Sequence, residues 1–304
     1  MAGKNSGNGK LTLGPVLFNW PAETWRDFYF RIADEAPVET VYLGEVVCSK
    51  RSPFYAPVLD EVAGRLMEAG KQVVFSTLAL VTQGREADAV RELGRTRELM
   101  VEANDPTALR HLSGRPHIVG PYVNVYNEGT LLYLAGRGAV RVCLPFELPA
   151  HSLARLAAAA GEELEIEVQA FGRLPLALSA RCYHARAHHL HKDNCQFICG
   201  QDADGLELDT VSDQPFLSIN GIQTMSHTYV NLVDELAAMR AAGIGHFRLS
   251  PHSCDMVEVA AIFRAVLDGG LGADEAQAKL EEAVPAAEFS KSFYQGVPQH
   301  AKAG

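Results

Sequence analysis

The feature of this sequence that most restricts its fold is the alternation of two kinds of segment. Short runs of aliphatic and β-branched residues, typical of buried strands, alternate with longer segments of helical periodicity. The expected strands are Leu11–Phe18, Val41–Leu43, Val73–Ser76, His117–Val125, Ala139–Leu144, Leu164–Phe171, Phe216–Ile219 and Ile244–Leu249. Eight strands that alternate with helices over about 280 residues predict an α/β protein, a (β/α)₈ barrel of the TIM-barrel type.

The segments between these strands carry helix signals. Pro21 opens a helix that runs to about Glu35, and Pro57 begins another. The segment Glu86–Glu102 is rich in Arg and Glu, which is typical of a helix with one solvated face. Apolar spacing predicts the later helices, at Leu131–Leu134, Leu153–Ala160, Tyr229–Leu236 and Val259–Val266.

An open, doubly wound sheet is the alternative to a barrel. Such sheets commonly carry a glycine-rich phosphate loop after the first strand. Here Gly14 and Pro15 lie inside the first expected strand, and their surroundings match neither nucleotide-binding pattern. The sequence therefore favours the barrel and gives no reason to expect a nucleotide cofactor.

The alternation of expected strands and helices is interrupted once, and this interruption defines the expected domain organisation. We expect a disordered tail over residues 1–10, a single barrel-like domain over 11–284 and a loosely ordered tail over 285–304. Within the domain, an irregular Cys/His-rich insertion is expected after strand six, at about residues 172–214, with a hairpin near Leu206–Val211.

Composition and charge restrict the function. Hydrophobic residues make up 47% of the 304 residues and charged residues 21%, which is typical of a soluble globular protein. The net charge of −10 argues against a general nucleic-acid-binding protein. The N-terminus lacks the apolar stretch of a signal peptide, and no apolar run approaches the roughly 18 residues of a membrane span. We therefore expect no transmembrane segment, a cytoplasmic location and reduced cysteines.

Four of the six cysteines fall where a barrel places its chemistry. Cys48 follows the second expected strand, and Cys182, Cys195 and Cys199 lie in the insertion with the spacing C-x₁₂-C-x₃-C. Both positions belong to the C-terminal face of a barrel. Four thiolates suit a soft centre, either an iron–sulfur cluster or zinc. The alternative is that these are unrelated buried cysteines.

The remaining cysteines and the histidines of the insertion are open to simpler interpretations. Cys143 ends a strand and is expected to be a small buried residue, and Cys254, near a helix start, is also expected to be structural. One of the histidines could complete a Cys₃His zinc site, although helix-surface positions explain them as well. These histidines are His184, His188, His189 and His191.

Two further groups of residues are candidates for supporting roles. Basic residues near the cysteines could tune the potential of a cluster or could be solvated surface charges. They are Lys50, Arg51, Arg181, Arg186 and Lys192. Residues at expected strand ends could form a pocket for an aromatic ring or could serve turns. They are Asn19, Trp20, Ser76, Thr77, Asn124, Tyr126, Asn127, Glu147 and His252.

Three segments of the chain resemble the peptidase U32 family, also called collagenase-like peptidases. They are GPVLFNWP, LGEVVCSKR and ARCYHARAHHLHKDNCQFIC, and NCQFICGQD is the most discriminating part. The resemblance extends from about Leu11 to Leu267, and it is closest to the branch of the family that serves anaerobic ubiquinone biosynthesis.

This resemblance implies a cofactor, partners and an activity. It implies a [4Fe–4S] cluster on Cys48, Cys182, Cys195 and Cys199. It implies a heterodimer with a homologous, UbiU-like subunit that carries its own cluster, and a sterol-carrier-like accessory protein. Together they would hydroxylate the ring of a ubiquinone precursor without O₂, with prephenate as the oxygen source. A non-catalytic scaffold subunit, a zinc-dependent hydrolase and an RNA-hydroxylating protein of the same family are the alternatives.

Overall fold

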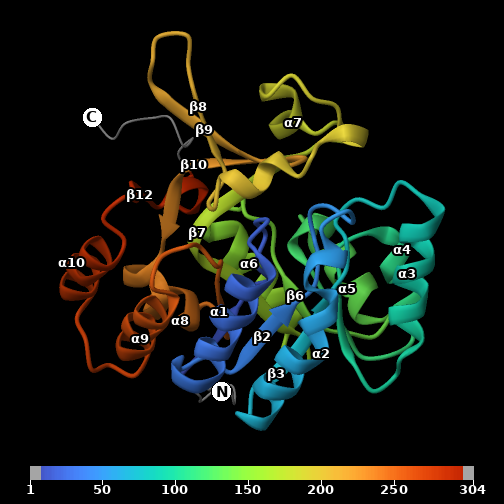
Figure 1. Cartoon of the computed structure of the whole chain (residues 1–304). Helices are drawn as coiled ribbons and strands as arrows, with labels where there is room; N and C mark the ends of the chain where they lie inside the picture. Colours follow the sequence, from blue (N-terminus) through green and yellow to red (C-terminus); the bar gives the residue numbers. More distant parts are fainter. Residues whose placement is uncertain (1–7, 297–304) are drawn as a thin grey trace.

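The computed structural model of the chain describes residues 8–296, and its centre is a closed ring of parallel strands (Figure 1). The strand order is β11-β1-β2-β3-β4-β5-β6-β7, and pairing of β11 with β7 closes the ring. The strands are β1 (Lys10–Leu13), β2 (Thr40–Leu43), β3 (Gln72–Ser76), β4 (Met100–Ala103), β5 (His117–Val119), β6 (Ala139–Cys143), β7 (Glu165–Leu178) and β11 (His246–Leu249). The predicted (β/α)₈ barrel is thereby confirmed.

Helices surround the ring and bury one apolar face each. In α9, for example, Val259, Ile262 and Phe263 recur at helical spacing and are buried against the strands. The helices are α1 (Ala22–Glu35), α2 (Ser52–Glu68), α3 (Gly84–Arg95), α4 (Pro106–Leu112), α5 (Glu128–Ala135), α6 (Ala150–Ala160), α8 (Leu236–Ala241), α9 (Met256–Leu267) and α10 (Ala273–Ala283). Short 3₁₀ turns occur at η1 (Pro121–Val123) and η4 (Val233–Glu235).

The number of barrel strands was predicted correctly through two errors that compensate. Met100–Ala103, expected as the end of a helix, is the barrel strand β4 between β3 and β5. Conversely, Phe216–Ile219 belongs to β9 (Pro215–Asn220), an antiparallel strand outside the ring. The helix expected at Tyr229–Leu236 is also wrong in part, because Tyr229 lies in strand β10 (Gln223–Asn231) and helix α8 begins only at Leu236.

An added layer of chain stands on the C-terminal ends of the barrel strands. The first half of β7 belongs to the ring, and its second half pairs antiparallel with β10. At Gly172, where φ is 102°, a Cβ atom would lie 2.8 Å from Ser250 Cβ, so this passage requires glycine. Figure 1 shows α7 (Tyr183–Ala187), β8 (Leu206–Asp209), β9 and β10 gathered at this one end.

The insertion therefore follows the seventh barrel strand and not the sixth, because β4 was missed. It also continues past residue 214 through β9 and β10. Its remaining elements are the 3₁₀ turns η2 (Lys192–Asn194) and η3 (Ile198–Gln201).

Both ends of the described chain are packed on the barrel. Lys10, expected in a tail, begins β1. In the expected C-terminal tail, β12 (Phe289–Ser290) pairs with β10 and is followed by η5 (Ser292–Gln295). Residues 1–7 and 297–304 lie outside the described residues. Between residues 8 and 296, no helix has the length and apolar character needed to cross a bilayer.

The interior of the barrel holds a network of buried charges. Arg248 Nη2 donates to Glu102 Oε1 at 2.6 Å and to Glu167 Oε2 at 3.1 Å, and its guanidinium lies 4.1 Å from the centre of the Tyr42 ring. Burial alone would raise the pKa of Glu167, but the charges of Arg248 and Arg141 outweigh it and lower that pKa to about 2. The network thus keeps charged groups in a barrel core that solvent does not reach.

Candidate functional site

The four predicted cysteines meet at one cavity of about 350 Å³. Cys48 follows β2, Cys182 is the N-cap of α7, Cys195 follows η2, and Cys199 lies in η3. All four are free cysteines with no disulfide. The fold therefore brings one thiol from an early barrel loop to three thiols of the late insertion, at the C-terminal mouth of the barrel.

The spacing of the sulfur atoms is wider than a single zinc ion requires. Four thiolates around one zinc, at about 2.3 Å each, lie roughly 3.8 Å apart. In residues 8–296, no three of the cysteine sulfurs lie within 4.8 Å of one another. None of the four histidines of the insertion lines the cavity. As they stand, the thiols and histidines of the insertion therefore do not form a compact Cys₄ or Cys₃His group among residues 8–296.

A buried carboxylate holds the loop that carries Cys48. Glu45 Oε1 accepts the backbone N–H groups of Val47 and Cys48, each at 2.8 Å. Burial raises the pKa of Glu45, while Arg51 and these two N–H donors act against the rise. Sequence analysis missed Glu45, although its position three residues before the cysteine in LGEVVC is a signal for such a side-chain turn.

Two of the thiols, those of Cys48 and Cys182, are in surroundings that disfavour an uncompensated thiolate. Burial raises the pKa of the Cys48 thiol, and Arg51 opposes this effect only in part. Burial also raises the pKa of Cys182, although its sulfur accepts the N–H of Ala185 at 3.4 Å. Metal ligation requires thiolates, so the binding of a cationic centre would displace protons from these groups.

Among the five basic candidates, Arg51 is the one enclosed in the wall of the cavity, with only 2% of its surface exposed. Its Nη1 donates to the Leu17 carbonyl at 2.8 Å, and its Nη2 donates to Asn220 Oδ1 at 2.9 Å. Its Nε is buried and has no hydrogen-bond acceptor within the described part of the chain. An unpartnered N–H in a wall of thiols fits a sulfur-rich, negatively charged occupant.

The other four basic residues lie nearer the surface. Lys50 and Lys192 also line the cysteine cavity, and Lys50 Nζ donates to the Lys192 carbonyl. Arg181 and Arg186 are exposed in an adjoining cleft of about 1050 Å³. Cys182 and Lys192 line both the cavity and this cleft, so the cleft adjoins the cysteine site.

The two remaining cysteines lie outside the cavity. Cys143, at the end of β6, is fully buried, and burial raises the pKa of its thiol well above the ordinary value. Cys254 Sγ contacts Met256 Sδ at 3.6 Å, and burial raises its pKa to about 12. Neither residue lines the cysteine cavity.

The residues expected at strand ends are mostly engaged within the chain. Trp20 is buried and donates its indole N–H to the Ala203 carbonyl at 2.8 Å, whereas Tyr126 is 46% exposed and bonds to Glu147. Asn127 accepts the N–H of Thr130 as the N-cap of α5. Contacts within the chain thus engage the side chains of Trp20, Tyr126 and Asn127, and of these only Asn127 serves as a cap.

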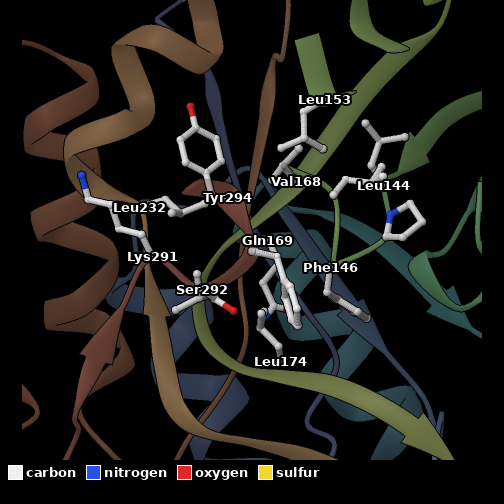
Figure 2. Close-up of a pocket in the computed structure, with 14 residues that line it drawn as sticks. Leu144, Phe146, Leu153, Val168, Gln169, Leu174, Leu232, Lys291, Ser292 and Tyr294 are labelled. Carbon is white, nitrogen blue, oxygen red and sulfur yellow. The ribbon is translucent and has the colours of Figure 1, made fainter. Parts of the chain in front are cut away.

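A separate apolar cavity of about 320 Å³ lies between the barrel and the C-terminal segment. Figure 2 shows Phe146, Gln169 and Leu174 around it, with the Lys291 ammonium directed away. Lys291 is bound instead to Asp234 and Glu235. The cavity shares no lining residue with the cysteine cavity and is therefore not part of that site.

Comparison with known proteins places the chain in a family. The sequence model of peptidase family U32 matches residues 22–303. The chain belongs to peptidase family U32. The match covers the barrel from α1 onward, the insertion and all four cysteines of the cavity of this U32 protein, and strand β1 lies before it.

Solved structures that the chain matches include three enzymes with 8–10% sequence identity to it. One is the N-acetylneuraminate lyase of Fusobacterium nucleatum with pyruvate: 10% identity, TM-score 0.48, covering 93% of this chain and 84% of that chain. Another is the D-psicose 3-epimerase of Clostridium cellulolyticum H10 with D-tagatose: 8% identity, TM-score 0.32, 91% and 98% covered. The third is the spore cortex-lytic enzyme SleL of Bacillus megaterium QM B1551: 10% identity, TM-score 0.29, 93% and 75% covered. None of these likenesses bears on function.

One arrangement in this U32 protein has the residue types of a hydrolase triad but not its geometry. Asp204 accepts a hydrogen bond from Ser253 and lies 3.6 Å from Nδ1 of His252. However, His252 is fully buried, and its Nε2 accepts the backbone N–H of Arg173 at 2.9 Å. This nitrogen is therefore not available to activate a serine, and the arrangement gives no support to peptide hydrolysis.

Proposed function

We propose that this chain is the UbiV-type subunit of an O₂-independent hydroxylase that acts, with a homologous UbiU-like subunit, on the ring of ubiquinone precursors. Cys48, Cys182, Cys195 and Cys199 would hold one [4Fe–4S] cluster. The observation that carries the proposal is the convergence of these thiols on one cavity from two distant parts of the chain. The hydroxylase chemistry rests on the resemblance of the cysteine-bearing segments to that branch of the family.

When bound, the cluster would supply one-electron exchange. The chain's own residues would hold and screen it. Glu45 fixes the loop of Cys48, and Arg51 places a positive charge beside the thiolates. Phe197 lines the cavity and packs edge-on against Phe54, with ring centres 4.6 Å apart, which limits the access of water and oxygen. Such screening suits an oxygen-sensitive centre.

The reaction balances between the ring and the oxygen donor. Insertion of an oxygen atom into a ring C–H bond removes two electrons from the ring, and the oxygen donor accepts both as it gives up the oxygen. The sterol-carrier-like accessory protein would present the apolar tail of the precursor.

The cleft next to Cys182 suits an anionic oxygen donor. Arg181, Arg186 and Lys192 line it, although the whole chain carries a net charge of −10. A local concentration of positive charge attracts carboxylates. Prephenate carries two carboxylates and would enter by this route. An RNA would be attracted by the same charges, and tight, salt-sensitive RNA binding would favour the RNA-hydroxylating alternative instead.

The Arg51 charge is expected to raise the reduction potential of the cluster. Replacing Arg51 by methionine removes a positive charge and so disfavours the reduced, more negative state. At an effective dielectric constant of about 20, a unit charge a few ångströms away contributes ~2–3 kcal/mol, so the potential should become roughly 100 mV more negative. The measurement is a redox titration followed by EPR. Arg51→Lys, which keeps the charge, should shift the potential less than Arg51→Met, and equal shifts would contradict this role.

The proposed function is tested by reconstituting the complex without oxygen. This chain, its UbiU-like partner and the accessory protein are incubated with a ubiquinone precursor and prephenate, and the hydroxylated product is quantified. We expect product that depends on all three proteins and on prephenate. If Cys182→Ala still joins the complex and supports full hydroxylation, the chain is a scaffold. A colourless protein with zinc at the cysteines would indicate the zinc hydrolase.

A further inference from the structure

The insertion contains a second group of metal-binding side chains, separate from the cysteine cavity. His184, His188 and Asp202 each offer one ligand atom, and these three atoms all lie within 4.8 Å of one another. None of the three residues lines the cysteine cavity. His184 and His188 are one helical turn apart on α7 and its C-cap, and their rings stack at 5.8 Å with an angle of 15°.

The hydrogen bonds of His184 define the role of each ring nitrogen. Its Nδ1 lies 3.2 Å from the Ile219 carbonyl oxygen, which can only accept, so Nδ1 carries the hydrogen. This contact is the usual support for a metal-binding histidine. In the neutral ring, Nε2 then carries a lone pair, and it lies 2.8 Å from Asp202 Oδ2, which is also an acceptor. The contact thus places a ring nitrogen and a carboxylate oxygen, two metal-ligand atoms, side by side.

A proton on His184 would satisfy this contact alone, whereas a metal ion also accounts for His188. The ligand atom of His188 lies within 4.8 Å of the other two, and an ion pair between His184 and Asp202 would not need a third ligand atom there. Imidazole and carboxylate ligands together suit zinc and similar ions. In a tetrahedral zinc site the Nε2–Oδ2 distance is about 3.3 Å, so the pair would open by about half an ångström.

We propose that His184, His188 and Asp202 bind one divalent transition-metal ion of the zinc class. The ion would join the segment that follows Cys182 to the segment that follows Cys199, because His184 and Asp202 lie two and three residues beyond those cysteines. It would therefore clamp the insertion that carries three of the four cysteines. This site does not depend on the identity of the centre held by the cysteines.

The test is the binding of zinc to the intact protein, purified without oxygen, in competition with a chromophoric chelator. We expect one tightly bound zinc per chain in the wild type, and binding at least ~10-fold weaker in His188→Ala. His188 is chosen because the buried His184 and its contacts stay in place. His191→Ala is the matched control, since His191 is an exposed histidine of the same segment outside the group, and it should bind zinc as the wild type does.

Zinc X-ray absorption distinguishes this site from the cysteine cavity. We expect nitrogen and oxygen ligands at about 2.0–2.1 Å and no sulfur at about 2.3 Å. Equal zinc affinity in the wild type and in His188→Ala would overturn the proposal, and so would sulfur ligation of the zinc that His188→Ala loses. If the cysteines held no cluster, zinc bound there would show sulfur ligands, so failure of the proposed function is told apart from failure of this site.

Discussion

Replacing Cys182 by alanine is expected to lower the iron content of the anaerobically purified protein at least ~10-fold and to remove its broad visible absorbance. The reason is geometric. The Cys182 sulfur lines the cavity together with the other three thiols, and the loss of one of four ligands opens the centre. Iron, acid-labile sulfide and the visible spectrum are measured on the same preparation. Cys48→Ala, Cys195→Ala and Cys199→Ala should behave alike.

The chain supplies matched controls for this experiment. Cys143 and Cys254 are cysteines of the same barrel that do not line the cavity. Their alanine variants should retain wild-type iron and colour. A Cys182→Ala protein that keeps its far-ultraviolet spectrum but loses iron separates ligation from folding. Retention of iron by this variant, or its loss from Cys143→Ala, would show that the ligand set is wrong.

Replacing Arg248 by methionine is expected to destabilise the barrel by about 3–5 kcal/mol at neutral pH. The change leaves the buried carboxylates of Glu102 and Glu167 without the guanidinium that bridges them. Urea unfolding at pH 7 measures the difference. Arg65→Met is the control, because the Arg65–Asp34 ion pair is about half exposed and its loss should cost no more than ~1 kcal/mol. Equal effects of the two substitutions would contradict a structural role for the network.

This destabilisation should also depend on pH in a defined direction. The pKa of Glu167 is lowered in the folded state from 4.5 to about 2, so its contribution to stability is complete above pH 4.5. That contribution is lost as the pH falls towards 2. The difference in unfolding free energy between wild type and Arg248→Met should therefore shrink over this interval. A difference that stays constant down to pH 2 would show that the destabilisation does not come from the lost charge interaction.

The barrel fold was predictable from the alternation of strand-like and helix-like segments, but the identity of individual barrel strands was not. Glu102 made Met100–Ala103 look like the end of an Arg/Glu-rich helix, because a charged residue is not expected inside a barrel. Its carboxylate is buried there only because Arg248, 146 residues later, pairs with it. Likewise, the apolar run at Phe216–Ile219 has the composition of a barrel strand, but it pairs antiparallel with β10, whose last residues, from Tyr229, were expected to begin a helix. A partner far along the chain decided the first case, and a hairpin with the next strand decided the second.

The candidate site was predictable to the extent that it depends on cysteine spacing. The C-x₁₂-C-x₃-C pattern and Cys48 identified the thiols that line the cavity. Which other side chains form the wall of the cysteine cavity was not predictable. Five basic residues were equal candidates, and Arg51 stands apart only because Asn220, 169 residues away, holds its guanidinium in the wall. The sequence near Arg51 does not indicate a contact with a residue so far along the chain.

The account depends most directly on what the four cysteines hold. The decisive measurement is the quantitation of iron and acid-labile sulfide, with Mössbauer spectroscopy, on wild-type protein purified without oxygen. The account predicts about four iron and four sulfide per chain. A protein that folds but contains no acid-labile sulfide, with zinc or free thiols at the cysteines, would contradict it.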